Sequence, residues 1–94
     1  MEKGTKVIVR TYSAGVHYGD YAGHTGKECT LLNTRRIYRW QGALSLTDIA
    51  ADGLSVESKI SAVSPEIILT EAIEIIKVTA NAQDVIDGVK AWKT

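Results

Sequence analysis

The sequence has no phenylalanine, only one cysteine, one proline and one methionine, and no long apolar run. The single cysteine, Cys29, excludes a disulfide within the chain and a cysteine-based zinc site built from one chain. No segment approaches the eighteen or so apolar residues that a membrane span needs, and the opening MEKGTKVIVR has no apolar run of signal-peptide length. We therefore expect a cytoplasmic protein with no membrane partner.

A chain of 94 residues is the size of one small domain, and we expect a single domain over residues 1–94. A domain this small buries only roughly 60 to 65% of its unfolded surface when it folds, so its stability is modest. Assembly into a homo-oligomer is therefore the default expectation.

Charge and aromatic residues are distributed unevenly along the chain. Residues 1–40 hold seven cations and three acids, 7 − 3 = +4, while residues 41–94 hold four and eight, 4 − 8 = −4. All four arginines and five of the six aromatic residues lie in the first part. Because the acidic second part would repel a phosphate backbone, long nucleic acid is not a favoured partner.

Four strands are expected in the first part. KVIVRTYS over residues 6–13 is rich in β-branched residues and alternates between two sets of residues, which predicts a strand. VHYGDYA over 16–22 predicts a second strand, weakened by Gly19, and Gly23 to Gly26 forms the connection after it. A third strand follows over 27–32, then a turn at Asn33-Thr34 and a fourth strand over 35–40. On that fourth strand Arg36, Tyr38 and Trp40 share one face, and Arg35, Ile37 and Arg39 share the other.

The second part predicts two short helices. Ser45 is a good N-cap and Gly53 is placed to end the first helix, while a last helix over about 80–88 is capped by Thr79 or Asn81 and ended by Gly88. Between them the β-branched residues favour two strands, 59–69 and 72–79, although Pro65 would also suit the start of a helix.

These elements predict an α+β fold with a curved, mostly antiparallel sheet of five or six strands and two covering helices. A small, partly open barrel is the rolled form of the same sheet.

The sequence contains no convincing arrangement of catalytic or metal-binding residues. Glu71 and Glu74 would point to opposite faces of a strand, and His17, Asp20 and His24 have no recognised ligand spacing. The glycines form neither a dinucleotide-binding nor a phosphate-binding loop. We expect no catalytic residue, no metal and no cofactor, and therefore no enzyme.

The arginine and aromatic residues point more clearly to binding. Arginine makes two-pronged contacts with phosphate, and tyrosine or tryptophan stacks on a base. The alternative is that surface strands carry arginine and tyrosine for cross-strand pairing. The ligand-binding set predicted from the sequence is Arg10, Tyr12, Asn33, Arg35, Arg36, Tyr38 and Trp40.

The segments VIVRTYSAGV, KECTLLNTRRIYRWQGALSLTDIA, LTEAIEII and VKAWK together resemble a family of small uncharacterised proteins from tailed phages and prophages. The chain departs from that pattern at Cys29, at Thr34 and at Tyr38-Arg39. The matching positions are Arg10, Thr11, Tyr12, Ser13, Gly15, Asn33, Arg35, Arg36, Trp40, Gly42, Ala43, Ser45 and Leu46.

The resemblance implies a phage protein in the cytoplasm of a bacterial host, but it does not imply a particular activity. By analogy with other small phage proteins, the expected function is to sequester a small anionic, nucleotide-derived ligand such as a host immune signal. In this hypothesis Arg35 and Arg36 hold phosphates and Tyr38 and Trp40 stack on a base. The alternative is a protein-interaction module that uses the same arginine and aromatic patch.

Overall fold

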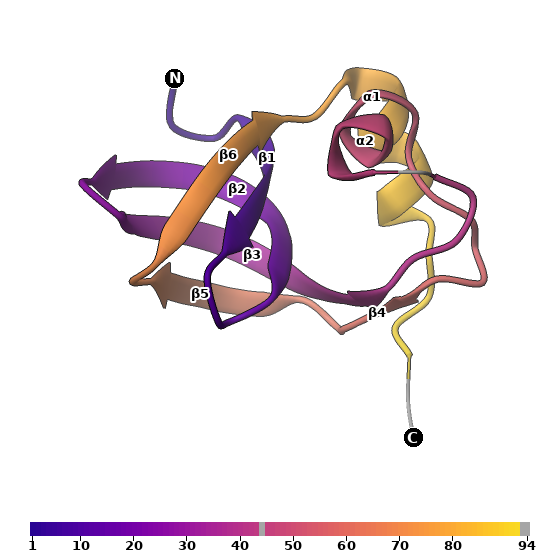
Figure 1. Cartoon of the computed structure of the whole chain (residues 1–94). Coiled ribbons are helices and arrows are strands. Elements are labelled where there is room, and N and C mark those ends of the chain that lie inside the picture. Colours follow the sequence, from indigo (N-terminus) through magenta and orange to yellow (C-terminus); the bar gives the residue numbers. More distant parts are fainter. Residues whose placement is uncertain (44, 93–94) are drawn as a thin grey trace.

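The computed structural model describes residues 1–43 and 45–92. It confirms the predicted α+β class, with six antiparallel strands and two helices (Figure 1). The elements in chain order are β1 Lys6–Thr11, β2 Val16–Thr25, β3 Glu28–Arg39, α1 Leu46–Asp52, β4 Lys59–Ile60, β5 Ser64–Leu69, β6 Ala72–Lys77 and α2 Ala80–Asp87.

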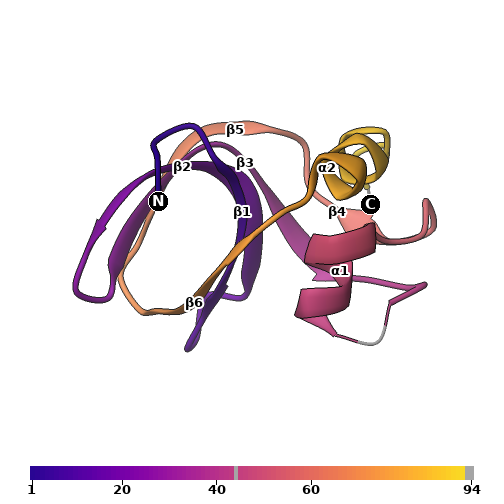
Figure 2. The same cartoon turned by 90° about the horizontal axis from the view of Figure 1, so that it is seen from above.

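The strands form one sheet in the order β4-β3-β2-β1-β6, and β5 also pairs with β3. The twelve-residue β3 is long enough to pair with β5 along its first half and with β4 at its end. The sheet curves strongly (Figure 2), yet no backbone pairing among the described residues joins β5 to β6. The sheet is therefore open rather than a closed barrel.

The strand β3 corrects the predicted turn at Asn33-Thr34. One continuous strand runs through both residues, and the register with β2 shifts there by one residue. Asn33 has a φ of 50°, the left-handed conformation that asparagine tolerates in a bulge. Gly19 lies opposite, where a β-carbon would stand 2.9 Å from Thr34 Cγ2, so a glycine permits this close approach.

Other boundaries also differ from the predictions. β2 continues to Thr25, so the connection to β3 is shorter than the predicted Gly23 to Gly26 turn. The predicted strand over 59–69 is two strands, β4 and β5, separated by residues 61–63. Residues 64–69 and 72–77 are strands, which settles the choice that Pro65 left open.

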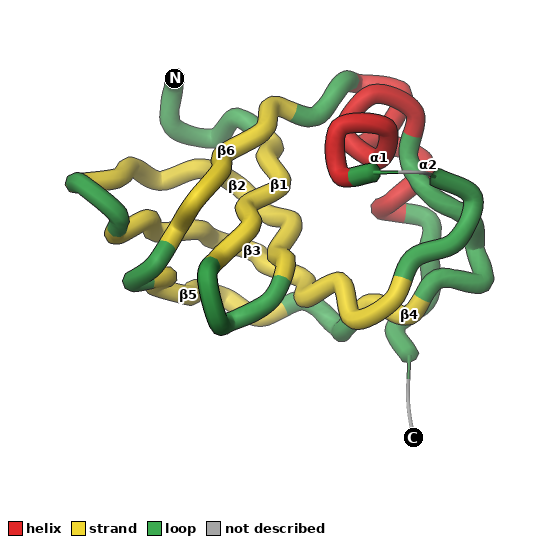
Figure 3. Tube along the Cα trace, viewed as in Figure 1, coloured by secondary structure: helices red, strands yellow, loops and turns green. Residues whose placement is uncertain are grey.

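Both helices begin and end close to where their capping residues predict. The Ser45 side chain accepts a hydrogen bond from the Asp48 amide, and the Gly53 amide donates to the Ile49 carbonyl. Thr79 caps α2 in the same way by accepting from the Ala82 amide. The two helices lie beside one another on the same side of the sheet (Figure 3).

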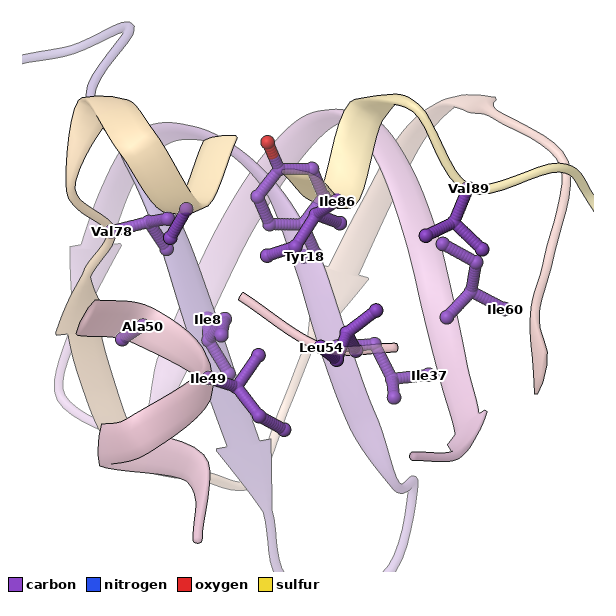
Figure 4. Packing of buried hydrophobic residues seen from close by; sticks show 11 residues of the cluster. Ile8, Tyr18, Ile37, Ile49, Ala50, Leu54, Ile60, Val78, Ile86 and Val89 are labelled. Carbon is purple, nitrogen blue, oxygen red and sulfur yellow. The ribbon is translucent and has the colours of Figure 1, made fainter. Parts of the chain in front are cut away.

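The curved sheet separates two apolar cores. The helix-side core lies between the outer face of the sheet and the helices, where Ile8, Tyr18 and Ile37 meet Ile49 and Ile86 (Figure 4). The inner core lies on the opposite face of the sheet and consists of Val7, Val9, Tyr21, Cys29, Leu31 and Leu69. On β3, Ile37 therefore faces the helices, whereas Cys29 and Leu31 face the inner side of the curve.

Candidate functional site

The two adjacent arginines of β3 face opposite sides of the sheet. Tyr18 of β2 pairs with Arg35, and its neighbour His17 pairs with Arg36. Directly opposed residues in an antiparallel pair project to the same face. Arg35 therefore lies with Tyr18 on the helix side, and Arg36 lies with His17 on the inner side.

Arg35 is a structural residue. It is only 6% exposed, and its guanidinium donates hydrogen bonds to the carbonyls of Ser61 at 2.8 Å, Ile86 at 3.1 Å and Val89 at 2.7 Å. Burial lowers the pKa of Arg35 from its usual value, while the nearby Asp87 acts in the opposite direction. Because the protein's own carbonyls take these donors, we reassign Arg35 from the predicted ligand set to holding the end of α2.

Tyr18 reinforces this attachment of α2. Its hydroxyl donates a 2.8 Å hydrogen bond to Asp87 Oδ1 at the last residue of the helix. Burial and the Asp87 carboxylate both raise the Tyr18 pKa, so the hydroxyl keeps its proton. Tyr18 and Arg35, which face the helices, therefore both hold the end of α2 against the sheet.

Arg36 lines a groove on the inner side. The groove has a volume of about 210 Å³ and lies between β3 and the segment that carries β5. Among the residues that the structure describes, the Arg36 guanidinium has no ion-pair or hydrogen-bond partner. The residues that line the groove are His17, Thr34, Arg36, Tyr38, Ser61, Ser64, Glu66 and Ile67.

His17 forms the buried floor of this groove. It is 1% exposed, and its Nε2 lies 2.8 Å from the Ala14 carbonyl, an arrangement in which Nε2 carries the proton and donates. Burial lowers its pKa, the Ala14 carbonyl partly opposes this, and the positive charge of Arg36 lowers the pKa further. His17 is therefore neutral at pH 7, which leaves Arg36 as the cationic group of the groove.

An exposed aromatic pair lies at one end of the groove. The Tyr38 and Trp92 rings meet edge to face with their centres 6.0 Å apart, and the Lys59 ammonium lies 4.8 Å from the centre of the Trp92 ring. Tyr38 is 55% exposed and also lines the groove. Its ring is therefore open to a planar ligand that approaches Arg36.

The other predicted ligand residues do not join this groove. Arg10 makes a 2.6 Å ion pair with Glu74, and Asn33 donates to Asp20. Trp40 packs against the helix-side core. Arg10, Asn33 and Trp40 therefore make contacts within the protein and do not line the groove. Of the predicted set, only Arg36 and Tyr38 line it.

Tyr12 lies in a separate hollow. It is 78% exposed and lines a space of about 390 Å³ together with Lys27, Glu71, Ala72 and Ile73. This hollow forms where the connection between β5 and β6 meets the β2–β3 hairpin, since the Ala72 amide donates to the Lys27 carbonyl. Tyr12 is thus apart from Arg36.

Sequence reasoning missed the groove residues that come from β5 and from the segment before it. Ser61, Ser64 and Glu66 are ordinary polar residues that lie 23 to 30 positions after Arg36 and Tyr38. Only the pairing of β5 with β3 brings them to the groove, and no local pattern encodes that pairing. The burial of His17 likewise depends on its register with β3.

The described residues include no group of three or more histidine, cysteine or acidic side chains placed to hold a metal ion. None of the helices in this part of the chain has the length and apolar character of a transmembrane segment. Cys29 is buried in the inner core, and burial raises its pKa, which keeps the thiol protonated. The groove therefore offers hydrogen bonding, one cation and an aromatic face.

A model of the domain of unknown function DUF6948 matches residues 4–86, which is most of the chain. The chain belongs to the DUF6948 family. No curated protein and no solved structure gives a significant match. The matched region contains every strand of the sheet and all eight groove-lining residues.

Proposed function

We propose that this protein is a non-catalytic binding module that sequesters a small anionic, nucleotide-derived ligand in the groove beside Arg36 and Tyr38. The observation that carries the proposal is the unpaired Arg36 guanidinium, which lies among hydroxyl groups and next to an exposed tyrosine ring. Arg36 would hold a phosphate, and Tyr38 would stack on the base.

The biological setting follows from the resemblance of the sequence to proteins of tailed phages. In this setting the protein acts in the cytoplasm of a bacterial host, where trapping a nucleotide immune signal would not require its cleavage. Self-association would add stability to a domain of this size.

A thermal-shift screen against linear and cyclic nucleotides tests the proposal. A ligand at 100 times its Kd stabilises the folded state by about 2.7 kcal/mol, which raises the Tm of a domain of this size by roughly 10 °C or more. Arg36→Ala should weaken binding about tenfold or more because it removes a charge-assisted contact. The matched control is Arg39→Ala, which removes an exposed arginine that does not line the groove.

The outcome that contradicts this proposal is a screen without any shift, or a shift that Arg36→Ala and Arg39→Ala leave equally unchanged. A shift that is lost only with Arg36→Ala supports the groove as the binding site.

One observation favours a second candidate function, a protein-interaction module. Tyr38 and Trp92 are exposed, contact each other and lie beside Lys59, and such aromatic and cationic groups dominate protein-binding hot spots. In that case a stoichiometric host protein should be recovered with the wild type and lost with Trp92→Ala, while nucleotides leave the Tm unchanged.

A further inference from the structure

The floor of the groove presents a hydrogen-bonding atom to the ligand, Nδ1 of His17. Nε2 of the same ring donates to the Ala14 carbonyl, whereas Nδ1 has no hydrogen-bond partner among the described residues. In this part of the chain, no buried side-chain nitrogen or oxygen lacks a hydrogen-bond partner. Since His17 lines the groove and only 1% of it is exposed, Nδ1 is the atom that reaches the groove surface.

His17 lies close to the place where Arg36 would hold an anion. The two residues are directly opposed on β2 and β3, and the β-carbons of such a pair lie about 4.5 to 5.5 Å apart on one face of the sheet. The positive charge of Arg36 lowers the pKa of His17, which reflects the same closeness. A phosphate bound by Arg36 therefore lies within reach of Nδ1.

The other groups around the His17 ring are uncharged. On the inner face of the sheet, β1 places Val9 opposite His17, and β6 places Ile75 beside Val9. The walls of the groove add the phenol of Tyr38 and the hydroxyls of Thr34, Ser61 and Ser64. Arg36 is therefore the charged side chain that acts on this ring.

Glu66 also lines the groove, but its side chain points away from His17. Glu66 pairs with Leu32, which pairs in turn with Asp20, and Asp20 lies two residues after Tyr18 on the helix-side face of β2. Because directly opposed residues share a face, Glu66 projects to the face opposite His17. Among the groove-lining residues, no carboxylate therefore competes with a ligand for the His17 ring.

The neutral His17 ring opposes an anion until it gains a proton. In the neutral ring Nδ1 carries a lone pair, and a phosphate oxygen likewise only accepts hydrogen bonds. If Nδ1 takes a proton from the solvent, it donates to the phosphate while Nε2 keeps its bond to the Ala14 carbonyl. The negative charge of the phosphate favours this protonated ring, so one proton is taken up for each ligand bound.

The charge of the protonated groove matches a terminal phosphate. His17 and Arg36 then supply two positive charges. A terminal phosphate carries a charge of about −1.5 to −2 at pH 7, whereas the phosphate of a diester carries a single negative charge. A terminal phosphate therefore neutralises both cations and stabilises the added proton more than a diester does.

We infer that His17 is a second phosphate-binding residue of the groove, that it takes up a proton as the ligand binds, and that the ligand has a terminal phosphate. This inference rests on the proposed function, because it needs Arg36 and Tyr38 to hold a nucleotide in the groove. His17 is then the specificity-determining residue that distinguishes nucleotides with a terminal phosphate from cyclic nucleotides.

Titration calorimetry with AMP and 3′,5′-cyclic AMP tests the inference, since the two nucleotides share a base and a sugar and differ in the phosphate. The wild type should bind AMP about tenfold more tightly than cyclic AMP at pH 7.0. Uptake of one proton changes affinity by about tenfold per pH unit, so AMP binding should weaken about fivefold or more from pH 7.0 to 8.0. Cyclic AMP binding should change by less than about twofold over this range.

One variant assigns the proton to His17. His17→Gln cannot titrate, so it should bind AMP and cyclic AMP with similar affinity and should lose the pH dependence. The control is Arg39→Ala, which removes an exposed charge outside the groove and should keep both properties.

Imidazole NMR of the wild type gives a second readout that needs no variant. At pH 7.0 the His17 ring should show one N–H proton in the free protein and two in the presence of AMP. His24, whose ring contacts Tyr21 outside the groove, is the reference in the same spectrum and should not change.

Tighter binding of AMP with proton uptake that His17→Gln removes would establish the inference. If both nucleotides bind equally and without proton uptake, while Arg36→Ala weakens both, the inference is overturned and the proposed function stands. Proton uptake that persists in His17→Gln, or a His17 ring that keeps one N–H proton with AMP bound, would also overturn it. If neither nucleotide binds, the inference fails, and the screen of all nucleotides decides the proposed function separately.

Discussion

Arg35 and Arg36 are neighbours in the chain with identical side chains, yet they lie in opposite environments. Arg35 is enclosed between the sheet and α2 with three backbone carbonyls as partners. Arg36 opens into a groove without a partner among the described residues. The alternation of a strand decides which arginine serves the fold and which remains available to a ligand, because residue type is the same at both positions.

The largest expected difference between the two arginines is in the free energy of unfolding when each is replaced by alanine. Arg35→Ala leaves three carbonyls near the end of α2 without their donor, and each unsatisfied buried group costs about 1 to 3 kcal/mol. We expect Arg35→Ala to lower the free energy of unfolding by about 3 kcal/mol or more and Arg36→Ala to change it by less than about 0.5 kcal/mol. Urea unfolding measures both values.

A domain of this size has a small total stability, so Arg35→Ala risks leaving an unfolded population. Arg35→Lys is the milder variant, because its ammonium keeps the charge but cannot reproduce the planar fork of three donors. It should still lose more stability than Arg36→Lys. Equal and small losses at the two positions would mean that the contacts of Arg35 do not hold α2 in solution.

The local signals in the sequence predicted much of the fold. Ser45, Gly53 and Thr79 mark the helix ends because capping involves groups only a few residues apart. The alternation of β-branched residues likewise marked β1. The continuity of β3 was missed because asparagine favours both a turn and a left-handed bulge, and only the strand opposite decides between them.

The candidate site was predictable only in part, for a similar reason. The segment from Asn33 to Trp40 contains Arg36 and Tyr38, as the concentration of arginine and aromatic residues indicated. Which arginine is buried depends on the docking of α2, whose carbonyls lie about fifty residues away in sequence. Glu66 reaches the groove through the pairing of β5 with β3, and this contact is equally non-local.

Asn33 offers a smaller test, because its bulge adjoins the arginine pair. Asn33→Gly and Asn33→Val both remove the hydrogen bond to Asp20, but only valine is strained at a φ of 50°. We expect Asn33→Val to cost about 1 to 2 kcal/mol more than Asn33→Gly in urea unfolding. If the two variants lose equal stability, the hydrogen bond and not the backbone conformation explains the choice of asparagine.

The weakest expected effect concerns His17, the residue that pairs with Arg36 as Tyr18 pairs with Arg35. The folded state lowers the His17 pKa below 6.5, so below about pH 6.5 the unfolded chain binds a proton that the folded protein does not yet accept. Folding stability should therefore decrease as the pH falls from 6.5 toward the pKa of the folded state. Tm measurements between pH 7.5 and 5.5 would show this decrease for the wild type.

Two variants separate the causes of this pH dependence. His17→Gln keeps a side-chain donor near the Ala14 carbonyl but cannot titrate, so its Tm should decrease less over the same range. Arg36→Ala should reduce the decrease only in part, because burial is a larger cause of the lowered pKa than the Arg36 charge. If the Tm of His17→Gln decreases as much as that of the wild type, groups other than His17 cause the pH dependence. If the Tm of Arg36→Ala decreases as much as that of the wild type, the Arg36 charge does not contribute to the lowered His17 pKa.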